Sequence, residues 1–341
     1  MRSMHTPEAT TTHSRRRALS IMAAGAAMLL PGARSGTAAA PMPYRWQGIV
    51  LGAKAELTLY AADRGQAVTV IETCLAEVAR LEAIFSLHRP DSALNRLNRA
   101  GRLIDPPVEL VELLSQALVL SGLSGGRFDP TIQPLWRTIA EHFATPGANP
   151  AGPDAAVLAA SRALVDRRGV KLAAGAIAFD RPGMQITLNG IAQGYVSDRI
   201  GDLLRARGFT HALVNLGETL AIDRRADGEA WKIGIPAPDD PSRPVETLEL
   251  RSGAVATSAG LGLRFDATGR FNHIVDPTRL ACADPDRGIT VLAGSAAVAD
   301  GLSTLGAMIP DLSRDFAPLL ARFGARAYVV SAATRKASLL G

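Results

Sequence analysis

Hydrophobic positions along the chain follow helical spacing in some segments and strand spacing in others. In residues 68–85, Ile71, Leu75, Val78 and Phe85 recur every three, four or seven residues and so share one face of a helix. Similar spacing predicts further helices at residues 107–123, 154–165, 191–208, 294–309 and 311–323. Alternating or short apolar runs predict strands at residues 48–60, 179–188, 211–222, 231–235, 245–255 and 288–292.

The order of these elements is irregular, and several strands follow one another in the second half of the chain. A doubly wound parallel sheet would instead alternate strands with helices. The Pro-rich segments at residues 145–153 and 236–244 indicate surface loops rather than domain boundaries. The pattern therefore predicts an α+β fold, with mixed sheets packed against helices in a single domain.

The first 40 residues have the composition of an export signal. Three arginines at positions 15–17 precede an apolar stretch at residues 21–30, and small residues at 38–40 form an A-x-A cleavage site. The apolar stretch is short for a membrane span, which favours cleavage over an uncleaved anchor. We expect residues 1–40 to be a Tat-type signal peptide and residues 41–341 to be the mature domain in the periplasm. After removal of the signal, we expect no transmembrane segment.

The charge balance argues against nucleic acid as a partner. The chain has 37 Lys and Arg against 32 Asp and Glu. Five of these arginines and one of these acidic residues lie in the first 40 residues, which leaves 32 basic against 31 acidic residues in the mature chain. A nucleic-acid-binding domain usually carries a clear basic excess on one face, and this chain has none after processing.

One apolar segment contains two polar residues that would share a helical face. Asp300 and Thr304 lie four residues apart within residues 294–309, which are otherwise rich in Ala, Val, Leu, Gly and Met. A buried carboxylate needs a cation or hydrogen-bond donors, and Mg²⁺ prefers such oxygen ligands. The alternative is a hydrogen-bonded core helix in which Thr304 bonds back to a carbonyl. On this segment alone, the core-helix interpretation is favoured.

Four further polar segments lie between apolar elements. They are residues 85–92 with His88, residues 125–131 with Arg127 and Asp129, residues 188–195 with Gly190, and residues 273–277 with His273. A start of a helix that is rich in glycine, as at residues 188–195, can present free N–H groups to an anion. Each segment by itself is better explained by turn formation or by surface histidines than by a functional site.

The order and spacing of these motifs resemble the ApbE family of FAD:protein FMN transferases. The family's Met-Gly-Thr, Phe-Ser-x-Tyr-x-Pro and Gly-x-Phe-Asp-x-Thr elements have counterparts in the first half of the chain. Its Asp-Leu-Gly-Gly-Ile-Ala-Lys-Gly-Tyr, Asn-Leu-Gly-Gly, Ala-Thr-Ser, His-Ile-x-Asp-Pro and Ala-Asp-x-x-x-Thr elements follow in the second half. The matching segments are residues 51–53, 85–92, 126–135, 187–195, 215–218, 256–258, 273–277 and 299–304.

The resemblance implies a fold, an activity and a cofactor. The fold would be a single T-fold-related domain with its active site in a central cleft. The enzyme would cleave the pyrophosphate of FAD in the presence of Mg²⁺, transfer FMN to a threonine hydroxyl of an acceptor flavoprotein, and release AMP. With the Tat signal, the pattern resembles the branch of the family that accompanies nitrous-oxide respiration. Its acceptor would be a flavoprotein of a respiratory membrane complex.

The resemblance also assigns roles to individual residues. Asp300, Thr304 and the main-chain carbonyl of Gly190 would bind Mg²⁺, which makes Asp300 catalytic, and His273 would orient or deprotonate the acceptor threonine. The residues that would contact FAD are Leu51, His88, Arg127, Phe128, Asp129, Thr187, Gln193 and Val275.

Several positions depart from the family's pattern. Thr187 stands where Asp is usual, Gln193 where Lys is usual, and Glu218 where the second glycine of Asn-Leu-Gly-Gly is usual. The first two changes could exchange an ion pair for neutral hydrogen bonds, or could weaken FAD binding. Two alternatives therefore stay open: a periplasmic FAD-binding carrier or maturation chaperone without transfer activity, and an FAD pyrophosphatase that yields FMN and AMP.

Overall fold

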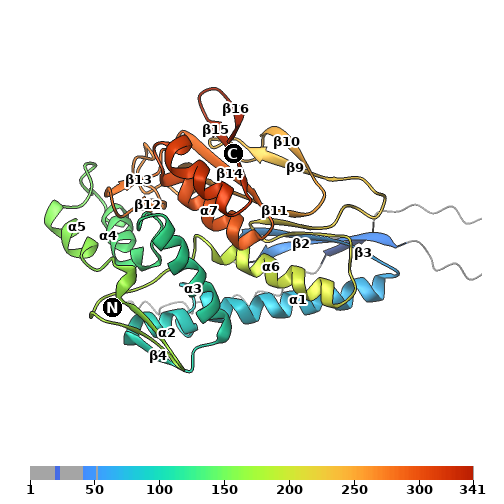
Figure 1. Ribbon diagram of the computed structural model, residues 1–341, viewed down its shortest axis with the longest axis horizontal. Helices are drawn as coiled ribbons and strands as arrows, with labels where there is room; N and C mark the ends of the chain where they lie inside the picture. Colours follow the sequence, from blue (N-terminus) through green and yellow to red (C-terminus); the bar gives the residue numbers. More distant parts are fainter. Residues whose placement is uncertain (1–19, 24–40, 51–52, 341) are drawn as a thin grey trace, which may run out of the picture.

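The computed structural model describes residues 20–23, 41–50 and 53–340. Within these residues, nine strands form one antiparallel sheet in the order β1-β2-β3-β7-β8-β11-β14-β15-β16 (Figure 1). The strands of this sheet are β1 (Ser20–Ala23), β2 (Met42–Val50), β3 (Ala53–Ala61), β7 (Ala212–Asn215), β8 (Thr219–Ile222), β11 (Gly253–Ala259), β14 (Arg287–Ala293), β15 (Arg326–Ser331) and β16 (Lys336–Leu340).

Helices α1 (Arg64–Phe85), α6 (Ala192–Ala206) and α7 (Ala296–Met308) lie along one face of this sheet. The hairpin of β9 (Trp231–Pro236) and β10 (Pro244–Leu250) covers part of the other face. Strand β11 illustrates that both faces of the sheet are buried. Successive side chains of a strand point to opposite faces. Ala254 and Ala256 belong to the helix-side core, whereas Val255 packs with Trp231 of the hairpin.

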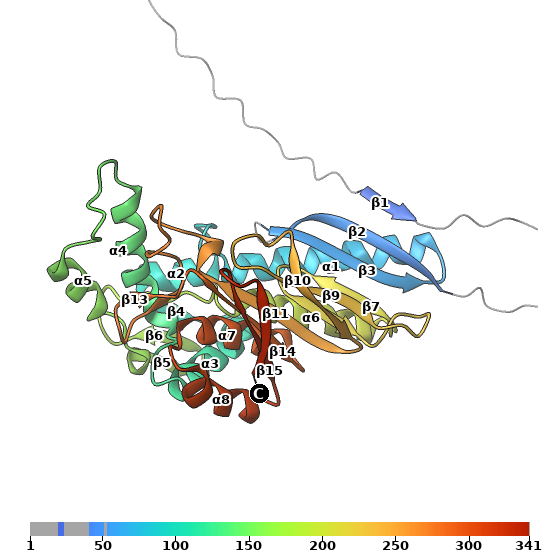
Figure 2. The same cartoon turned by 90° about the horizontal axis from the view of Figure 1, so that it is seen from above.

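A smaller region lies at the end of the molecule away from β2 and β3, where α4 and α5 project (Figure 2). It contains a three-stranded sheet in the order β4-β6-β5 and the short pair β12–β13. Its strands are β4 (Arg102–Ile104), β5 (Val170–Ala173), β6 (Ala176–Phe179), β12 (Val275–Asp276) and β13 (Ala281–Cys282). The remaining α-helices are α2 (Ala93–Ala100), α3 (Val108–Leu123), α4 (Gln133–Ala144), α5 (Ala155–Arg162) and α8 (Ala317–Arg322).

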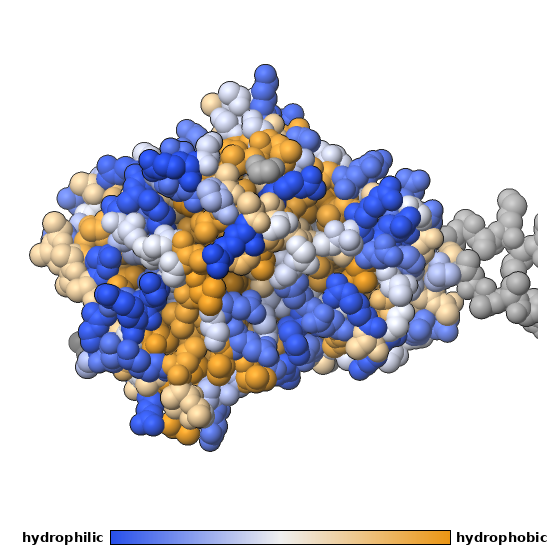
Figure 3. Space-filling model, in the orientation of Figure 1, coloured by the Kyte–Doolittle hydropathy of each residue, from blue (hydrophilic) through white to orange (hydrophobic). Residues whose placement is uncertain are grey.

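Hydrophilic residues interrupt the hydrophobic ones across the face shown in Figure 3. The hydrophobic residues of α1 are examples of apolar side chains that are buried in the core. Ile71, Cys74 and Leu81 are fully buried against the main core, as the helical spacing of this segment predicts. Within the part of the chain that the structure describes, no helix is long and apolar enough to cross a membrane.

The predicted α+β class is confirmed, and so are the main helices. The strand predicted at residues 179–188 is wrong, because β6 ends at Phe179. Met184, Ile186 and Leu188 are alternately buried as in a strand, but the backbone of Ile186 bonds to a side chain instead of a neighbouring strand. The side chain is the Asn98 amide, which accepts from the Ile186 N–H at 2.7 Å and donates to its carbonyl at 2.8 Å.

Three other predicted strand segments each contain parts of two strands. Residues 211–222 form two strands, β7 and β8, on either side of a turn at Gly217. Residues 245–255 are divided between β10 and β11, and residues 48–60 between β2 and β3. Helices α2 and α4 and strands β15 and β16 were not predicted.

Candidate active site

Helix α7 carries Asp300 and Thr304 in its middle, and its first turn is fixed by hydrogen bonds. Ser295 is the N-cap, and its hydroxyl accepts from the Val298 N–H. The carboxylate of Asp198, from α6, accepts from the Ala296 N–H at 2.8 Å and the Ala297 N–H at 2.9 Å, and from the Ser295 hydroxyl at 2.7 Å. These bonds satisfy donors that a helix start leaves free, so they fix α7 against α6.

Asp300, on α7, is buried against the start of α6, and 4% of its surface is exposed. One of its carboxylate oxygens accepts from the Gly194 N–H at 3.0 Å. Burial and the nearby charge of Asp198 raise the pKa of Asp300 to about 7, although the Gly194 bond lowers it. The second oxygen of Asp300 has no hydrogen bond within the described residues, so this carboxylate is suited to bind a cation.

Thr304 lies one turn further along α7, next to strand β11 and to Gly190. Its hydroxyl is 3.3 Å from the Ser258 hydroxyl, which also bonds to Ser303 at 2.8 Å. A Cβ atom at position 190 would lie 3.0 Å from the Thr304 methyl carbon and 3.2 Å from the Phe128 ring. Because Gly190 has no Cβ, its backbone can approach both side chains, and the structure brings Gly190, Phe128 and Thr304 together. Asp300 lies one turn before Thr304 on the same helix.

The turn between β7 and β8 faces the start of α6. Gly217 has a φ of 111°, in the region that favours glycine, and a Cβ atom there would lie 2.6 Å from the amide nitrogen of Gln193. The next residue, Glu218, is buried, and burial and the charge of Asp300 raise its pKa. Gln193 therefore packs against this turn. In residues 53–340, no hydrogen bond joins Gln193 to Thr187, whose hydroxyl accepts from the Asn189 N–H at 3.2 Å.

Arg127 joins the loop after α3 to strand β12. Its guanidinium forms an ion pair with Asp276 at 2.9 Å, and only 2% of the Asp276 side chain is exposed. The Asp129 carboxylate accepts from the N–H and hydroxyl of Thr131, while burial raises its pKa. Both residues therefore have structural partners, and the loop that contains Phe128 is anchored on either side.

A cavity of about 400 Å³ lies beside this loop. It reaches Gly126 and Asp129 on one side and Thr278 on the other. Four arginines line it, namely Arg162, Arg167, Arg168 and Arg181. With Asp129 and Asp166 as the acidic residues of its lining, the cavity has an excess of positive charge that would favour an anionic ligand.

His273 is half-buried, and its ring has a defined orientation. Its Nδ1 is 3.1 Å from the Leu263 carbonyl oxygen. Since a carbonyl can only accept, Nδ1 carries the proton and Nε2 of the neutral ring is free to accept one. Burial lowers the pKa of His273, although the Leu263 bond raises it. A Cβ atom at Gly262 would lie 3.4 Å from the ring, so His273 packs against the segment that follows Ser258.

The remaining predicted contacts lie outside this cluster. His88 is exposed in the loop after α1. Val275 is 6% exposed and packs in a separate cluster with Leu135 and Ile139, which leaves little of it free to face a ligand. Leu51 lies outside the residues that the structure describes.

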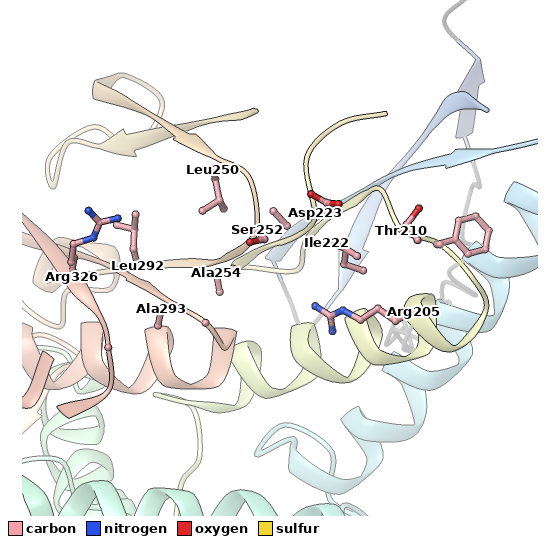
Figure 4. Close-up of a pocket in the computed structure, with 15 residues that line it drawn as sticks. Arg205, Thr210, Ile222, Asp223, Leu250, Ser252, Ala254, Leu292, Ala293 and Arg326 are labelled. Carbon is pink, nitrogen blue, oxygen red and sulfur yellow. The ribbon is translucent and has the colours of Figure 1, made fainter. Parts of the chain in front are cut away.

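A larger cavity, of about 690 Å³, lies elsewhere. It is formed where α6 and strands β8 and β14 end and where β11 and β15 begin, and none of the predicted site residues lines it. Arg205 approaches it from α6, and Arg326 lies towards its other end (Figure 4). The residues predicted from the motifs therefore lie away from the larger cavity.

The family pattern of ApbE matches residues 51–317. The chain belongs to the ApbE family. A relative from Vibrio cholerae, named FAD:protein FMN transferase, is 30% identical over 265 residues, which cover 75% of this chain and 77% of the relative. A relative of the same name from Treponema pallidum is 29% identical over 281 residues, covering 75% and 76%. The apo structure of the Pseudomonas stutzeri flavinyl transferase ApbE is 26% identical with a TM-score of 0.70, covering 85% of this chain and 91% of the other.

The ApbE fold places an oxygen-rich set of groups around Gly190. A carboxylate, a hydroxyl and a main-chain carbonyl are ligands that suit Mg²⁺, which commonly uses one or two carboxylates together with substrate phosphates. The described residues contain no group of three or more His, Cys, Asp or Glu side chains arranged for a metal. The close approach of Gly190 to Thr304 makes the residues present fit such an ion.

Sequence reasoning missed the residues that support this ApbE site. Ser258 lies within a matched motif but was given no role, although its hydroxyl contacts Thr304. Asp198, which fixes the start of α7, has a position in the middle of α6 that no sequence motif marks.

Proposed function

We propose that this chain is an FAD:protein FMN transferase that uses Mg²⁺. It would transfer the FMN part of FAD to a threonine hydroxyl of an acceptor flavoprotein and release AMP. The observation that carries the proposal is the convergence of Asp300, Thr304 and Gly190 in a chain of the ApbE family. Relatives that match three quarters of the chain are named FAD:protein FMN transferase.

Asp300, Thr304 and the Gly190 carbonyl would hold the magnesium ion. When bound, the ion neutralises charge on the pyrophosphate and on the departing AMP. Asp300 has the role of a buried anion whose charge is stabilised by the ion, and Gly194 holds it in place. Phosphoryl-type transfer depends mainly on such positioning and charge neutralisation, so no covalent intermediate with this protein is needed.

The anionic part of FAD would be attracted by the arginine-lined cavity. This cavity adjoins Gly126 and Thr278, which flank the Arg127–Asp276 ion pair. Guanidinium groups bind phosphate oxygens well because of their planar arrangement of donors. Phe128, which packs at Gly190, would limit water near the reacting phosphate.

His273 would accept the proton of the acceptor threonine. The threonine oxygen forms a bond to the FMN phosphorus, the bond from that phosphorus to the bridging oxygen breaks, and AMP leaves with the electron pair. Nε2 of His273 takes the hydroxyl proton, since Nδ1 is committed to the Leu263 carbonyl. The lowered pKa keeps this ring neutral near pH 7.

The activity is tested by incubating residues 41–341 with FAD, Mg²⁺ and an FMN-binding acceptor domain, followed by a denaturing gel under ultraviolet light. A fluorescent acceptor band that is lost with EDTA is expected. AMP without a labelled acceptor would instead indicate an FAD pyrophosphatase. Bound FAD with neither AMP nor label would indicate a carrier, which the exchanges at Thr187 and Gln193 would then explain.

We further propose that residues 1–40 direct export through the Tat pathway and that the mature protein acts in the periplasm. The acceptor would be a flavoprotein of a respiratory membrane complex, as in the branch that accompanies nitrous-oxide respiration. The support is the run of arginines, the apolar stretch and the A-x-A site. We expect wild-type cells to process the protein to its mature size. Cells without the twin-arginine translocase should accumulate the precursor. Equal processing in both would contradict it.

A further inference from the structure

Glu218 is a buried carboxylate next to the proposed metal site. It follows Gly217 in the turn before β8 and is 7% exposed. This is the position at which the family's Asn-Leu-Gly-Gly motif has its second glycine, so the carboxylate is an addition of this chain. A buried acidic group of this kind is costly unless something compensates its charge.

The contacts of Glu218 place it beside the strand that contacts Thr304. The Ser197 hydroxyl of α6 donates to the Glu218 carbonyl at 3.4 Å, and Thr219, the residue after Glu218, pairs with Val255 of β11. Further along β11, the Ser258 hydroxyl contacts Ser303 at 2.8 Å and Thr304 at 3.3 Å. Strand β11 thus holds Glu218 and Thr304 through neighbouring residues.

Glu218 and Asp300 both lie at the start of α6, because Gln193 packs against Gly217 and the Gly194 N–H donates to Asp300. Burial, followed by the charge of Asp300, raises the pKa of Glu218. In the described part of the chain, no basic side chain forms an ion pair with either carboxylate. Asp198 differs from them, because its two oxygens already accept three hydrogen bonds at the start of α7. Two buried carboxylates without a basic partner are stabilised well by a divalent cation.

We propose that Glu218 is a second carboxylate for the divalent cation held by Asp300 and Thr304. The inference rests on the metal site of the proposed function and adds a residue to it. Its consequence is that this chain binds the cation more tightly than it would with glycine or a neutral side chain at position 218. Gln193, which packs over Gly217, would help to hold the turn in place.

The test measures Mn²⁺ binding to nucleotide-free residues 41–341 by calorimetry and by electron paramagnetic resonance at one fixed pH. Glu218→Gln removes the charge but keeps the shape, and we expect it to raise the Kd at least tenfold. Glu218→Gly should do the same, whereas Glu218→Asp, which keeps the charge, should recover part of the affinity. The matched control is Glu246→Gln, an exposed glutamate on β10, which should leave the Kd unchanged.

Thermal unfolding separates a role at the metal from a role in folding. Without metal, Glu218→Gln should unfold at a temperature equal to or above that of the wild type, because the variant relieves repulsion with Asp300. With Mn²⁺, its unfolding temperature should rise less than that of the wild type. A residue with only a structural role would lower the unfolding temperature under both conditions.

The outcomes distinguish this inference from the proposed function. If Asp300→Asn abolishes Mn²⁺ binding while Glu218→Gln and Glu218→Gly bind within twofold of the wild type, the role of Glu218 is wrong and the metal site stands. If the wild type binds no Mn²⁺, or Asp300→Asn binds it equally well, the metal site and the role of Glu218 both fail.

Discussion

At the scale of single residues, the buried environment of Asp300 determines the pKa of its carboxyl group. The pKa of Asp300 is raised to about 7 in the metal-free protein, mainly by burial. Its ordinary value is 3.8, so the folded state binds the proton more tightly than the unfolded state. The stabilisation is therefore complete below pH 3.8 and is lost as the pH rises through about 7.

This difference predicts how the metal-free protein responds to pH. In EDTA, the free energy of unfolding of the wild type should fall between pH 5 and pH 8 relative to that of Asp300→Asn, which cannot ionise. Urea unfolding at several pH values measures the difference. If the two proteins keep a constant difference across this range, Asp300 is not the buried acid that the structure indicates.

His273 gives a second prediction, because its pKa is lowered from 6.5 by burial. The neutral ring therefore persists below pH 6.5, and the acid limb of kcat at saturating Mg²⁺ should lie below that value. His273→Ala should lower kcat by roughly 10²- to 10⁴-fold, the usual contribution of a general base, and change FAD binding little. The pH profile and FAD titrations measure these effects. Equal losses in kcat and in FAD affinity would make His273 a binding residue instead.

At the scale of helices and strands, the spacing of hydrophobic residues predicted the helices that pack directly on the hydrophobic core. The segment of α1 buries residues every three or four positions, and this pattern is visible without knowing the partner. The wrong strand at residues 179–188 shows the opposite case. Its alternating burial is genuine, but Asn98, 88 residues away, provides the hydrogen bonds that a strand partner would give. Local sequence contains no sign of that distant amide.

The start of α7 allows a prediction at the same scale. Asp198→Ala removes three hydrogen bonds from this helix start, and loss of such a cap costs about 1–2 kcal/mol. Because α7 carries both Asp300 and Thr304, we also expect weaker Mg²⁺ binding. Denaturant unfolding and metal titration measure the two effects, with Asp202→Ala, exposed on the same helix, as the control. An unchanged stability would mean that Ser295 alone is a sufficient cap.

At the scale of the whole molecule, the sequence predicted the family and the class of enzyme, but not how the residues of the candidate site are brought together. Asp300 and Thr304 could be paired because they lie four residues apart on one helix. Ser258 comes from strand β11, and only the packing of α7 on this strand shows that its hydroxyl reaches Thr304. The arginine-lined cavity likewise gathers residues from separate loops.

The predicted boundary between the signal peptide and the mature domain, at residue 40, concerns the whole chain. The family match begins at residue 51, and all the proposed site residues lie within residues 51–317. We therefore expect residues 41–341 to transfer FMN with a kcat within twofold of that of the full chain. Parallel assays of the two proteins measure this ratio. A much lower activity of the shorter protein would show that the first 40 residues contribute to the folded enzyme.

The central claim is that one metal-dependent reaction couples cleavage of FAD to labelling of a protein threonine. The most direct measurement counts AMP released and flavin attached to the acceptor in the same sample, for the wild type and for Asp300→Asn. The account predicts one AMP for each attached flavin in the wild type, and a loss of both products, on the order of 100-fold or more, in the variant. AMP in large excess over attached flavin, or full activity of Asp300→Asn, would contradict it.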